Sequence, residues 1–206
     1  FAEWYNDFSG GLRRRLYLGF LIAQSFHILH KDNRAYCDIS GNNVLVAEDK
    51  TKASVCMIDI DNVYVPGTDR TSILGTTRYM APEILNKQMQ PDILTDDYSL
   101  AVLLFELLRT GHPYVGDIVT EGSPEMENDA YKGLYPYVDD DEHSFNSSSK
   151  MLPGEAVFSS KLKALFKKTF VDGKTNRMSR ATSYELALAC LEASNLLVKC
   201  NACDAW

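Results

Sequence analysis

The chain has 206 residues, 45% of them hydrophobic and 11% aromatic, with a formal net charge of −7, which suits a globular protein of one large domain or two small ones. The acidic balance excludes a protein that binds nucleic acid without regard to sequence, because such proteins neutralise phosphates with basic patches. The longest apolar run, residues 100–108, is far shorter than the roughly 18 residues that a membrane-spanning helix needs, so no membrane segment is expected.

The first predicted element is a long, mostly buried helix over residues 12–30, after a leading segment at 1–11. Its apolar residues repeat at helical spacing, at Leu12, Leu16, Phe20, Ala23 and Phe26. Two short strands are predicted at 43–47 and 53–60. The polar residues EDKT between them indicate a hairpin.

Residues 61–83 contain Pro, Gly and many threonines and are predicted to be irregular. A second buried helix fits 97–109. Thr95 and Asp96 are candidates for its N-cap, and Gly111 is expected to end it.

A loop-rich stretch is predicted at 112–157, followed by two helices at about 160–170 and 181–198. The fold class is therefore mainly α with one small β-hairpin between the first two long helices. No internal repeat is present, and residues 1–198 are treated as one domain.

Five cysteines are present, an odd number that favours reduced thiols in a cytoplasmic protein; they are Cys37, Cys56, Cys190, Cys200 and Cys203. The C-x-x-C pair near the end has the spacing of half a zinc site. No second pair or histidines follow it, so zinc at Cys200 and Cys203 is only the minor alternative. Residues 199–206 are interpreted as a tail, with the start of another module as the alternative.

The stretch AYCDISGNNVLV, residues 35–46, places Asp38 five positions before Asn43 and ends in an apolar run. Taken alone it indicates a polar turn that opens a strand, because Asp, Ser, Gly and Asn all favour turns. A catalytic role for the two polar side chains depends on the rest of the chain.

Four further segments give this stretch a context. An aspartate, Asp59, follows the apolar run VCMI, and GTTRYMAPEIL lies at 75–85. The segment TDDYSLAVLLFELLRTGHPY follows at 95–114, and FVDGKTNRMS at 170–179. In this order and spacing, the segments resemble the eukaryotic-like protein kinase family. The resemblance runs from about residue 12 to 197 and covers the family's C-terminal lobe.

The resemblance implies an ATP- and Mg²⁺-dependent transfer of a phosphoryl group to a protein hydroxyl, of the serine/threonine type. Asp38 would accept the proton of the substrate hydroxyl and orient it. Asn43 and Asp59 would bind magnesium through oxygen atoms. Leu45 would lie against the adenine ring.

The resemblance also implies four supporting residues. Glu83 and Arg177 would form a buried ion pair that anchors the activation segment. Asp96 would accept backbone N–H groups of the catalytic loop. Thr76 resembles the threonine that contacts the catalytic aspartate in serine/threonine kinases.

Several positions depart from the family pattern. The usual His-Arg-Asp is Tyr36-Cys37-Asp38, and the usual Asp-Phe-Gly is Asp59-Ile60-Asp61. Ser40 stands where the family has a lysine that stabilises the transferred phosphate. These departures indicate a divergent, bacterial-type kinase.

The sequence contains no G-x-G-x-x-G loop, so the β-rich N-terminal lobe that covers the phosphates is expected to be absent from these residues. The chain begins at Phe1, which favours a fragment of a longer kinase over a natural half-kinase. The isolated 206 residues are expected to be inactive without that lobe in cis.

Three hypotheses for the function remain open. A protein kinase is favoured because Asp38, Asn43 and Asp59 are all retained. A pseudokinase that acts as a binding or scaffold module is the main alternative, because the accessory residues are lost. A kinase-fold enzyme acting on a small molecule ranks last.

Overall fold

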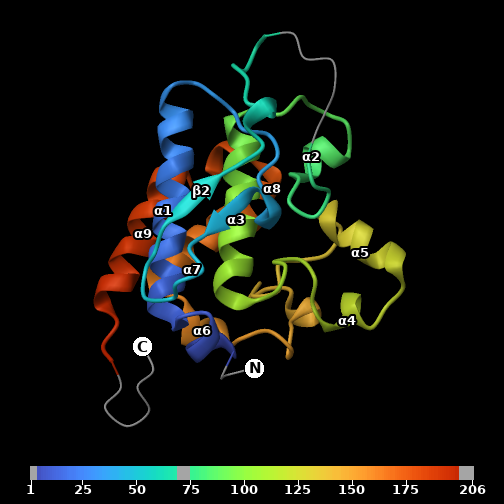
Figure 1. Cartoon of the computed structure of the whole chain (residues 1–206). Coiled ribbons are helices and arrows are strands. Elements are labelled where there is room, and N and C mark those ends of the chain that lie inside the picture. The colour runs from blue at the N-terminus through green and yellow to red at the C-terminus, as the bar shows by residue number, and fades with distance from the viewer. Residues whose placement is uncertain (1–3, 69–74, 200–206) are drawn as a thin grey trace.

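The computed structural model describes residues 4–68 and 75–199, which are mainly helical with one two-stranded antiparallel sheet. The longest helices are α1 (Gly11–Lys31), α3 (Ile93–Arg109) and α9 (Ser183–Leu196). Helices α1 and α9 lie side by side along much of their length, and α3 packs next to them (Figure 1). The predicted mainly helical fold with one small hairpin is confirmed.

The other elements are short. The strands are β1 (Val44–Val46) and β2 (Val55–Met57). The remaining helical segments are η1 (Trp4–Phe8), η2 (Gly41–Asn43), η3 (Ile60–Asn62), α2 (Pro82–Leu85), α4 (Asp117–Thr120), α5 (Pro124–Tyr131), η4 (Ser144–Asn146), α6 (Gly154–Val157), α7 (Ser160–Lys167), η5 (Lys168–Asp172), α8 (Gly173–Thr175) and η6 (Arg177–Ser179).

Helix α3 begins four residues before the predicted start. Asp92 is its N-cap, and its Oδ1 accepts the Thr95 N–H at 3.0 Å while Thr95 Oγ1 accepts the Asp92 N–H at 2.9 Å. This reciprocal pair satisfies two backbone donors at the helix start. The two predicted caps, Thr95 and Asp96, therefore lie inside the helix, and Asp96 is free for another role.

The stretch at 112–157, predicted to be loop-rich, contains helix α5, which was not predicted. Ser123 precedes this helix, and Pro124 occupies its first turn. Proline is favoured there because its missing N–H would have no partner in the helix. The local signal was thus present in the sequence.

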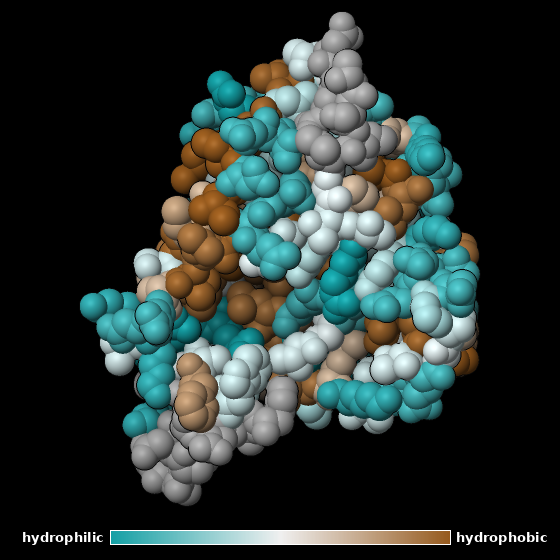
Figure 2. Space-filling model, turned by 45° about the vertical axis from the view of Figure 1, so that its right-hand side comes forward, coloured by the Kyte–Doolittle hydropathy of each residue, from teal (hydrophilic) through white to brown (hydrophobic). Residues whose placement is uncertain are grey.

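The hairpin is shorter than predicted. Its register pairs Val44 with Met57 and Val46 with Val55. The second strand ends early because Asp59 adopts a left-handed backbone with φ of 58°, which breaks an extended strand. Apolar side chains of the hairpin region are exposed, at Leu45, Val46, Ile58 and Ile60. Figure 2 shows hydrophobic residues gathered along one side of the molecule.

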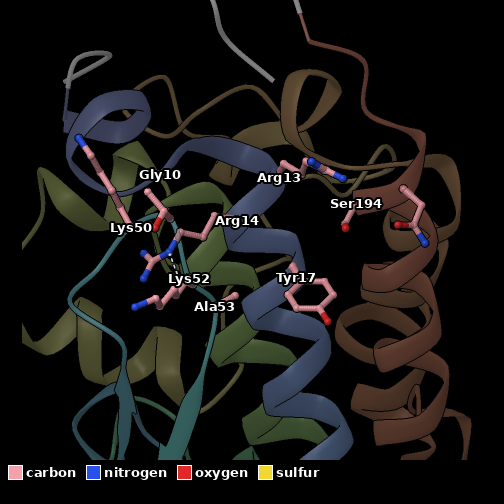
Figure 3. Close-up of a pocket in the computed structure, with 10 residues that line it drawn as sticks. Gly10, Arg13, Arg14, Tyr17, Lys50, Lys52, Ala53 and Ser194 are labelled. Atoms are coloured by element: carbon pink, nitrogen blue, oxygen red, sulfur yellow. Dashed lines mark hydrogen bonds between the residues drawn. The ribbon is translucent and has the colours of Figure 1, made fainter.

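The hairpin is attached to the first turn of α1 through one arginine. Arg14 Nε donates to the Lys52 carbonyl at 3.0 Å, and its Nη2 donates to the Ala47 carbonyl at 2.6 Å. Figure 3 shows this contact between the helix and the turn. The hairpin is therefore held at its turn, while its other end leads into the polar loop at 35–43.

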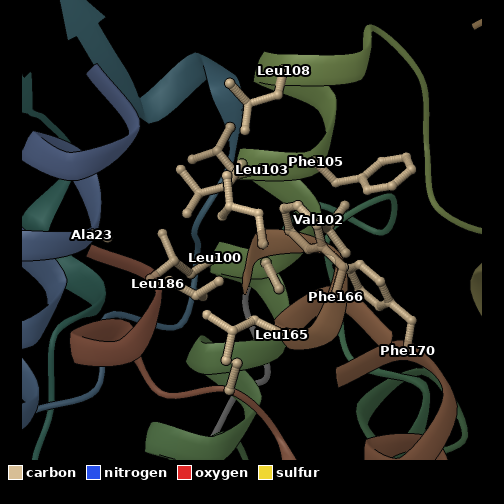
Figure 4. Packing of buried hydrophobic residues seen from close by; sticks show 14 of the residues in the cluster. Ala23, Leu100, Val102, Leu103, Phe105, Leu108, Leu165, Phe166, Phe170 and Leu186 are labelled. Atoms are coloured by element: carbon tan, nitrogen blue, oxygen red, sulfur yellow. The ribbon is translucent and has the colours of Figure 1, made fainter. Parts of the chain in front are cut away.

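The core lies between α3, α7 and η5, with side chains of α1 and α9 added from the other side (Figure 4). Phe105 is fully buried, and the centroids of four rings lie within 6.0 Å of its own, those of Tyr137, Phe158, Phe166 and Phe170. Among the helices that the structure describes, none is long and apolar enough to cross a bilayer.

We predict that Phe105→Ala lowers the free energy of unfolding by about 3–5 kcal/mol, because it removes a buried ring and leaves a cavity. Leu134→Ala is the matched control; Leu134 is 68% exposed, so the change should stay within about 0.5 kcal/mol. Urea unfolding followed by circular dichroism measures both. Equal effects of the two changes would contradict this location of the core.

Candidate active site

The polar loop at 35–43 is fixed by the carboxylate of Asp96 on α3. The Tyr36 and Cys37 N–H groups donate to the two carboxylate oxygens of Asp96, at 2.6 and 2.9 Å. Asp96 is 1% exposed. Cys37 has a positive φ of 70°, a conformation that is unfavourable for a side-chain-bearing residue unless its surroundings hold it. The Asp96 contacts supply that restraint.

His30, at the end of α1, balances the buried charge of Asp96. Its Nε2 lies 3.2 Å from Asp96 Oδ2, and its Nδ1 lies 3.1 Å from the Ser183 hydroxyl and 3.5 Å from Asp97 Oδ1. Burial opposes the charged imidazole, but hydrogen bonds to and the charges of the two aspartates outweigh it and raise the pKa of His30 to about 9. His30 was not among the predicted site residues. Its spacing four residues after the buried Phe26 was the available signal.

Asp38 lies at the centre of the site, and both of its carboxylate oxygens have partners. Thr76 Oγ1 donates to Asp38 Oδ1 at 3.1 Å. Asn43 Nδ2 donates to Asp38 Oδ2 at 3.1 Å and to the Asp38 carbonyl at 2.9 Å. The structure thus brings together Asp38, Asn43 and Thr76. The two contacts orient the carboxylate and leave lone pairs that can accept a further donor.

Asp59 lies on the neighbouring turn. The loop at 35–43 and the turn after β2 are joined at both ends. Ala35 and Tyr64 exchange two backbone hydrogen bonds of 2.9 and 3.0 Å, and the Ile58 N–H donates to the Asn43 carbonyl at 3.0 Å. The Asp59 side chain is exposed.

Two side chains of this region, Asn43 and Asp59, carry oxygen atoms of the kind that magnesium binds. Because the Asn43 amide nitrogen bonds to Asp38, its amide oxygen is directed elsewhere and can act as a ligand. Asp59 adds a carboxylate. No group of three or more His, Cys, Asp or Glu side chains able to hold a metal occurs among the described residues. Magnesium often needs just one or two protein carboxylates together with substrate phosphates.

Tyr36, which was predicted to replace a family histidine, is 1% exposed. Its hydroxyl donates to the Ile58 carbonyl. Burial, with the nearby charges of Asp38, Asp59 and Asp96, raises the pKa of Tyr36 to about 12. The phenol therefore stays protonated and connects the loop at 35–43 to the end of β2.

Leu45 and Ser40 differ from each other in exposure: the first is half exposed and the second is buried. Leu45 on β1 is 52% exposed, so about half of its surface is left uncovered by the described residues. Ser40 is 1% exposed, and its hydroxyl has no hydrogen-bond partner within the described part of the chain. Ser40 is therefore a buried residue that cannot reach toward a phosphate as a lysine would.

The predicted partner of Glu83 needs correction. Arg180, not Arg177, forms the two-pronged contact, with Nη1 2.7 Å from Oε1 and Nη2 2.8 Å from Oε2. Burial opposes ionisation of Glu83, but Arg180 outweighs it, so the pKa of Glu83 lies below its ordinary value.

Arg177 instead bonds to Asp92, the N-cap of α3, and its Nε lies 4.0 Å from Glu83 Oε1. Arg180 is the better partner for Glu83 because it is more deeply buried and its other N–H groups also have acceptors. Arg180 is 3% exposed and also donates to the Gly173 carbonyl at 3.1 Å and the Leu94 carbonyl at 3.0 Å. The two arginines are three residues apart, and the sequence alone does not separate them.

The family model of the protein kinase domain matches residues 17–189 of this chain. Because the match covers most of the 206 residues, the chain belongs to the protein kinase family. The resemblance to eukaryotic-like protein kinases is confirmed. Membership supports transfer of phosphoryl groups to proteins.

The curated relatives include "Death-associated protein kinase related" from Drosophila melanogaster, 31% identical over 103 residues, or 48% of this chain and 15% of that protein. Another is "Serine/threonine-protein kinase max-2" from Caenorhabditis elegans, 29% identical over 114 residues, or 50% of this chain and 17% of that protein. A third is "Serine/threonine-protein kinase 17A" from Oryctolagus cuniculus, 26% identical over 98 residues, or 47% of this chain and 24% of that protein.

Each match thus spans less than a quarter of the relative's length. These three relatives come from animals, and the bacterial-type origin stays a prediction. The predicted zinc alternative at Cys200 and Cys203 lies outside the described residues.

We predict that Arg180→Gln costs about 3–5 kcal/mol of unfolding free energy, because it leaves the carboxylate of Glu83 without its buried partner. Arg177→Gln should cost about 1 kcal/mol or less, since its side chain is 19% exposed and its ion pair is partly solvated. Chemical denaturation of both variants checks this. A larger loss for Arg177→Gln would restore the pairing that the sequence suggested.

We predict a pH dependence that belongs to His30. Its folded-state pKa of about 9 lies above the ordinary value of about 6.5. The stabilisation is therefore complete below about pH 6.5 and is lost as the pH rises through 9. In urea unfolding between pH 6 and 10, the stability advantage of wild type over His30→Gln should shrink across this window. A constant difference would show that the imidazole is not charged in the folded state.

Proposed function

We propose that this chain carries the catalytic loop of an ATP- and Mg²⁺-dependent protein kinase that phosphorylates serine or threonine side chains of a protein substrate. The observation that carries the proposal is the Asp38 carboxylate, held on one oxygen by Thr76 and on the other by Asn43. Family membership supports it, as do the serine/threonine-protein kinase names of the relatives.

In the proposed reaction, Asp38 accepts a hydrogen bond from the substrate hydroxyl and then its proton, while Thr76 and Asn43 keep the carboxylate aligned. Phosphoryl transfer depends mostly on such positioning and on neutralising phosphate charge. Asn43 and Asp59 would hold the metal, which when bound screens the phosphate oxygens. The hydrogen bonds of Asp96 to the loop keep Asp38 in place before the substrate arrives.

The proposal includes a second, β-rich lobe in the same polypeptide that covers the nucleotide, without which the 206 residues are inactive. Two observations support it. The sequence has no glycine-rich phosphate loop. Leu45, Val46 and Ile60 are 52%, 47% and 61% exposed around the site, and an apolar surface of this kind calls for an adenine ring and a covering partner.

A cytoplasmic location is part of the proposal. The cysteines that the structure describes, Cys37, Cys56 and Cys190, are free thiols. Reduced thiols are the rule in that compartment.

A pseudokinase scaffold is the second candidate, and one observation favours it. The loop lacks a cation beside Asp38, since Cys37 and the buried Ser40 replace the basic residues of the family. Less neutralisation of the transferred phosphate means slower transfer.

The test is phosphate incorporation from labelled ATP with magnesium, using the full-length polypeptide that contains this chain. We predict that Asp38→Asn lowers the rate by about 10²-fold or more, because it removes the proton acceptor. Asp141→Asn is the matched control, as this carboxylate is 86% exposed and far from the loop in sequence. Equal incorporation by wild type and Asp38→Asn would leave the scaffold as the function.

A further inference from the structure

The segment at 75–81 carries Thr76, whose hydroxyl donates to the carboxylate of Asp38. Residues 75–81 form neither a helix nor a strand. The hydrogen-bond ladder of a regular element therefore does not hold Thr76 in its position, and other contacts must do so.

The backbone of this segment passes close to the loop at 35–43. Gly75 has a positive φ of +147°, and a Cβ at this position would lie 3.0 Å from the Cys37 carbonyl oxygen. Only glycine allows this approach without strain. The residue before Thr76 is thus packed against the residue before Asp38.

Two hydrogen bonds set the course of the chain after Thr76. The Tyr79 N–H donates to the Thr76 carbonyl at 2.8 Å, and the Met80 N–H donates to the Thr77 carbonyl at 3.2 Å. Arg78 lies inside both of these turns, two residues after Thr76.

The guanidinium of Arg78 joins these turns to two helices. Its Nε donates to a carboxylate oxygen of Glu106 on α3, and its Nη1 donates to the Tyr131 hydroxyl on α5 at 2.9 Å. Glu127 Oε1, also on α5, lies 3.5 Å from the same Nη1. The side chain of Glu106 is only 15% exposed, so its attraction for Arg78 is screened less than that of a fully exposed pair.

Tyr79 orients the carboxylate that Arg78 meets. The Tyr79 hydroxyl bonds to Glu106 and accepts the Gly41 N–H. Burial, with the charge of Glu106, raises the pKa of Tyr79 to about 12. The hydroxyl therefore stays protonated and keeps Glu106 in place for the arginine.

The main chain of Arg78 is fixed as well. His112 is 1% exposed, and its Nε2 lies 2.9 Å from the Arg78 carbonyl oxygen. Because the Tyr114 N–H donates to Nδ1 of this ring at 3.2 Å, Nε2 carries the proton and donates it to Arg78. Burial and the charge of Arg78 lower the pKa of His112 to about 3, so the ring stays neutral.

Helix α3 supports both partners of the Asp38–Thr76 contact. In its first turns, Asp96 accepts N–H groups of the loop beside Asp38. In its last turn, Glu106 holds Arg78. The two carboxylates are ten residues apart in the sequence, which is about 15 Å along the helix at 1.5 Å per residue. One rigid helix thus sets the distance between the loop and the segment.

We propose that Arg78 is a positioning residue for phosphoryl transfer, one that keeps Thr76 on the carboxylate of Asp38. It does so through Glu106 and Tyr131, which hold its guanidinium on α3 and α5. This role rests on the proposed function, but the contacts that create it do not depend on catalysis. When the ion pair is lost, the turns loosen, and Asp38 loses the donor to one of its two oxygens.

Amide hydrogen exchange of the full-length polypeptide, resolved to single residues, tests the positioning without any need for activity. Arg78→Gln should speed exchange of the Tyr79 and Met80 N–H groups at least about tenfold, because their turns open more readily. Arg78→Lys keeps the charge and should give an intermediate rate. Lys132→Gln removes an exposed ion pair with Asp129 and should change these rates less than about twofold. Circular dichroism confirms that the variants are folded.

Phosphate incorporation from labelled ATP separates positioning from a general loss of structure. Arg78→Gln should lower kcat about tenfold or more and leave the KM for ATP within about twofold, because alignment at Asp38 is lost while nucleotide binding is not. Thr76→Val should also lower kcat. The double variant should be no slower than the slower single variant, because both changes remove the same contact.

A wild type without activity would contradict the proposed function, and the exchange rates would then decide the role of Arg78 by themselves. Three results would overturn that role. They are unchanged exchange of Tyr79 and Met80 in Arg78→Gln, a higher KM for ATP with kcat unchanged, and losses in kcat that multiply in the double variant.

Discussion

The carboxylate of Asp96 is the constraint on which the candidate active site depends. It is almost fully buried and accepts the N–H groups of two consecutive loop residues, Tyr36 and Cys37. A buried charge is costly unless it is paired and hydrogen-bonded, and the imidazolium of His30 supplies the pair. Because α1 and α3 both contribute to this contact, the packing of the two helices is transmitted directly to the backbone beside Asp38.

Further contacts connect the loop that Asp96 holds to the other polar residues of the candidate site. The Ala35–Tyr64 bridge and the Tyr36 hydroxyl join the loop to the turn that carries Asp59. Thr76, beyond the irregular segment, donates its hydroxyl to the carboxylate of Asp38.

Much of this arrangement could be predicted from the sequence, because the signals are local. The periodicity of residues 12–30 and the spacing from Asp38 to Asn43 both lie within single elements. The sequence alone could not show which of two neighbouring residues of the same type makes a given contact. Arg177 and Arg180 are equally cationic, and the choice of Arg180 as the partner of Glu83 goes with its deeper burial and its bonds to the Gly173 and Leu94 carbonyls. His30 gained its role from side chains 66 and 153 residues away along the chain.

Amide hydrogen exchange of the wild-type chain tests most directly whether Asp96 fixes the loop. The N–H groups of Tyr36 and Cys37 should exchange about as slowly as those in the middle of α3, since opening them requires breaking bonds to a buried carboxylate. The N–H group of Glu48, in the exposed turn between the strands, serves as the fast reference. Exchange of Tyr36 and Cys37 at the rate of that turn would show that Asp96 does not hold the loop at 35–43.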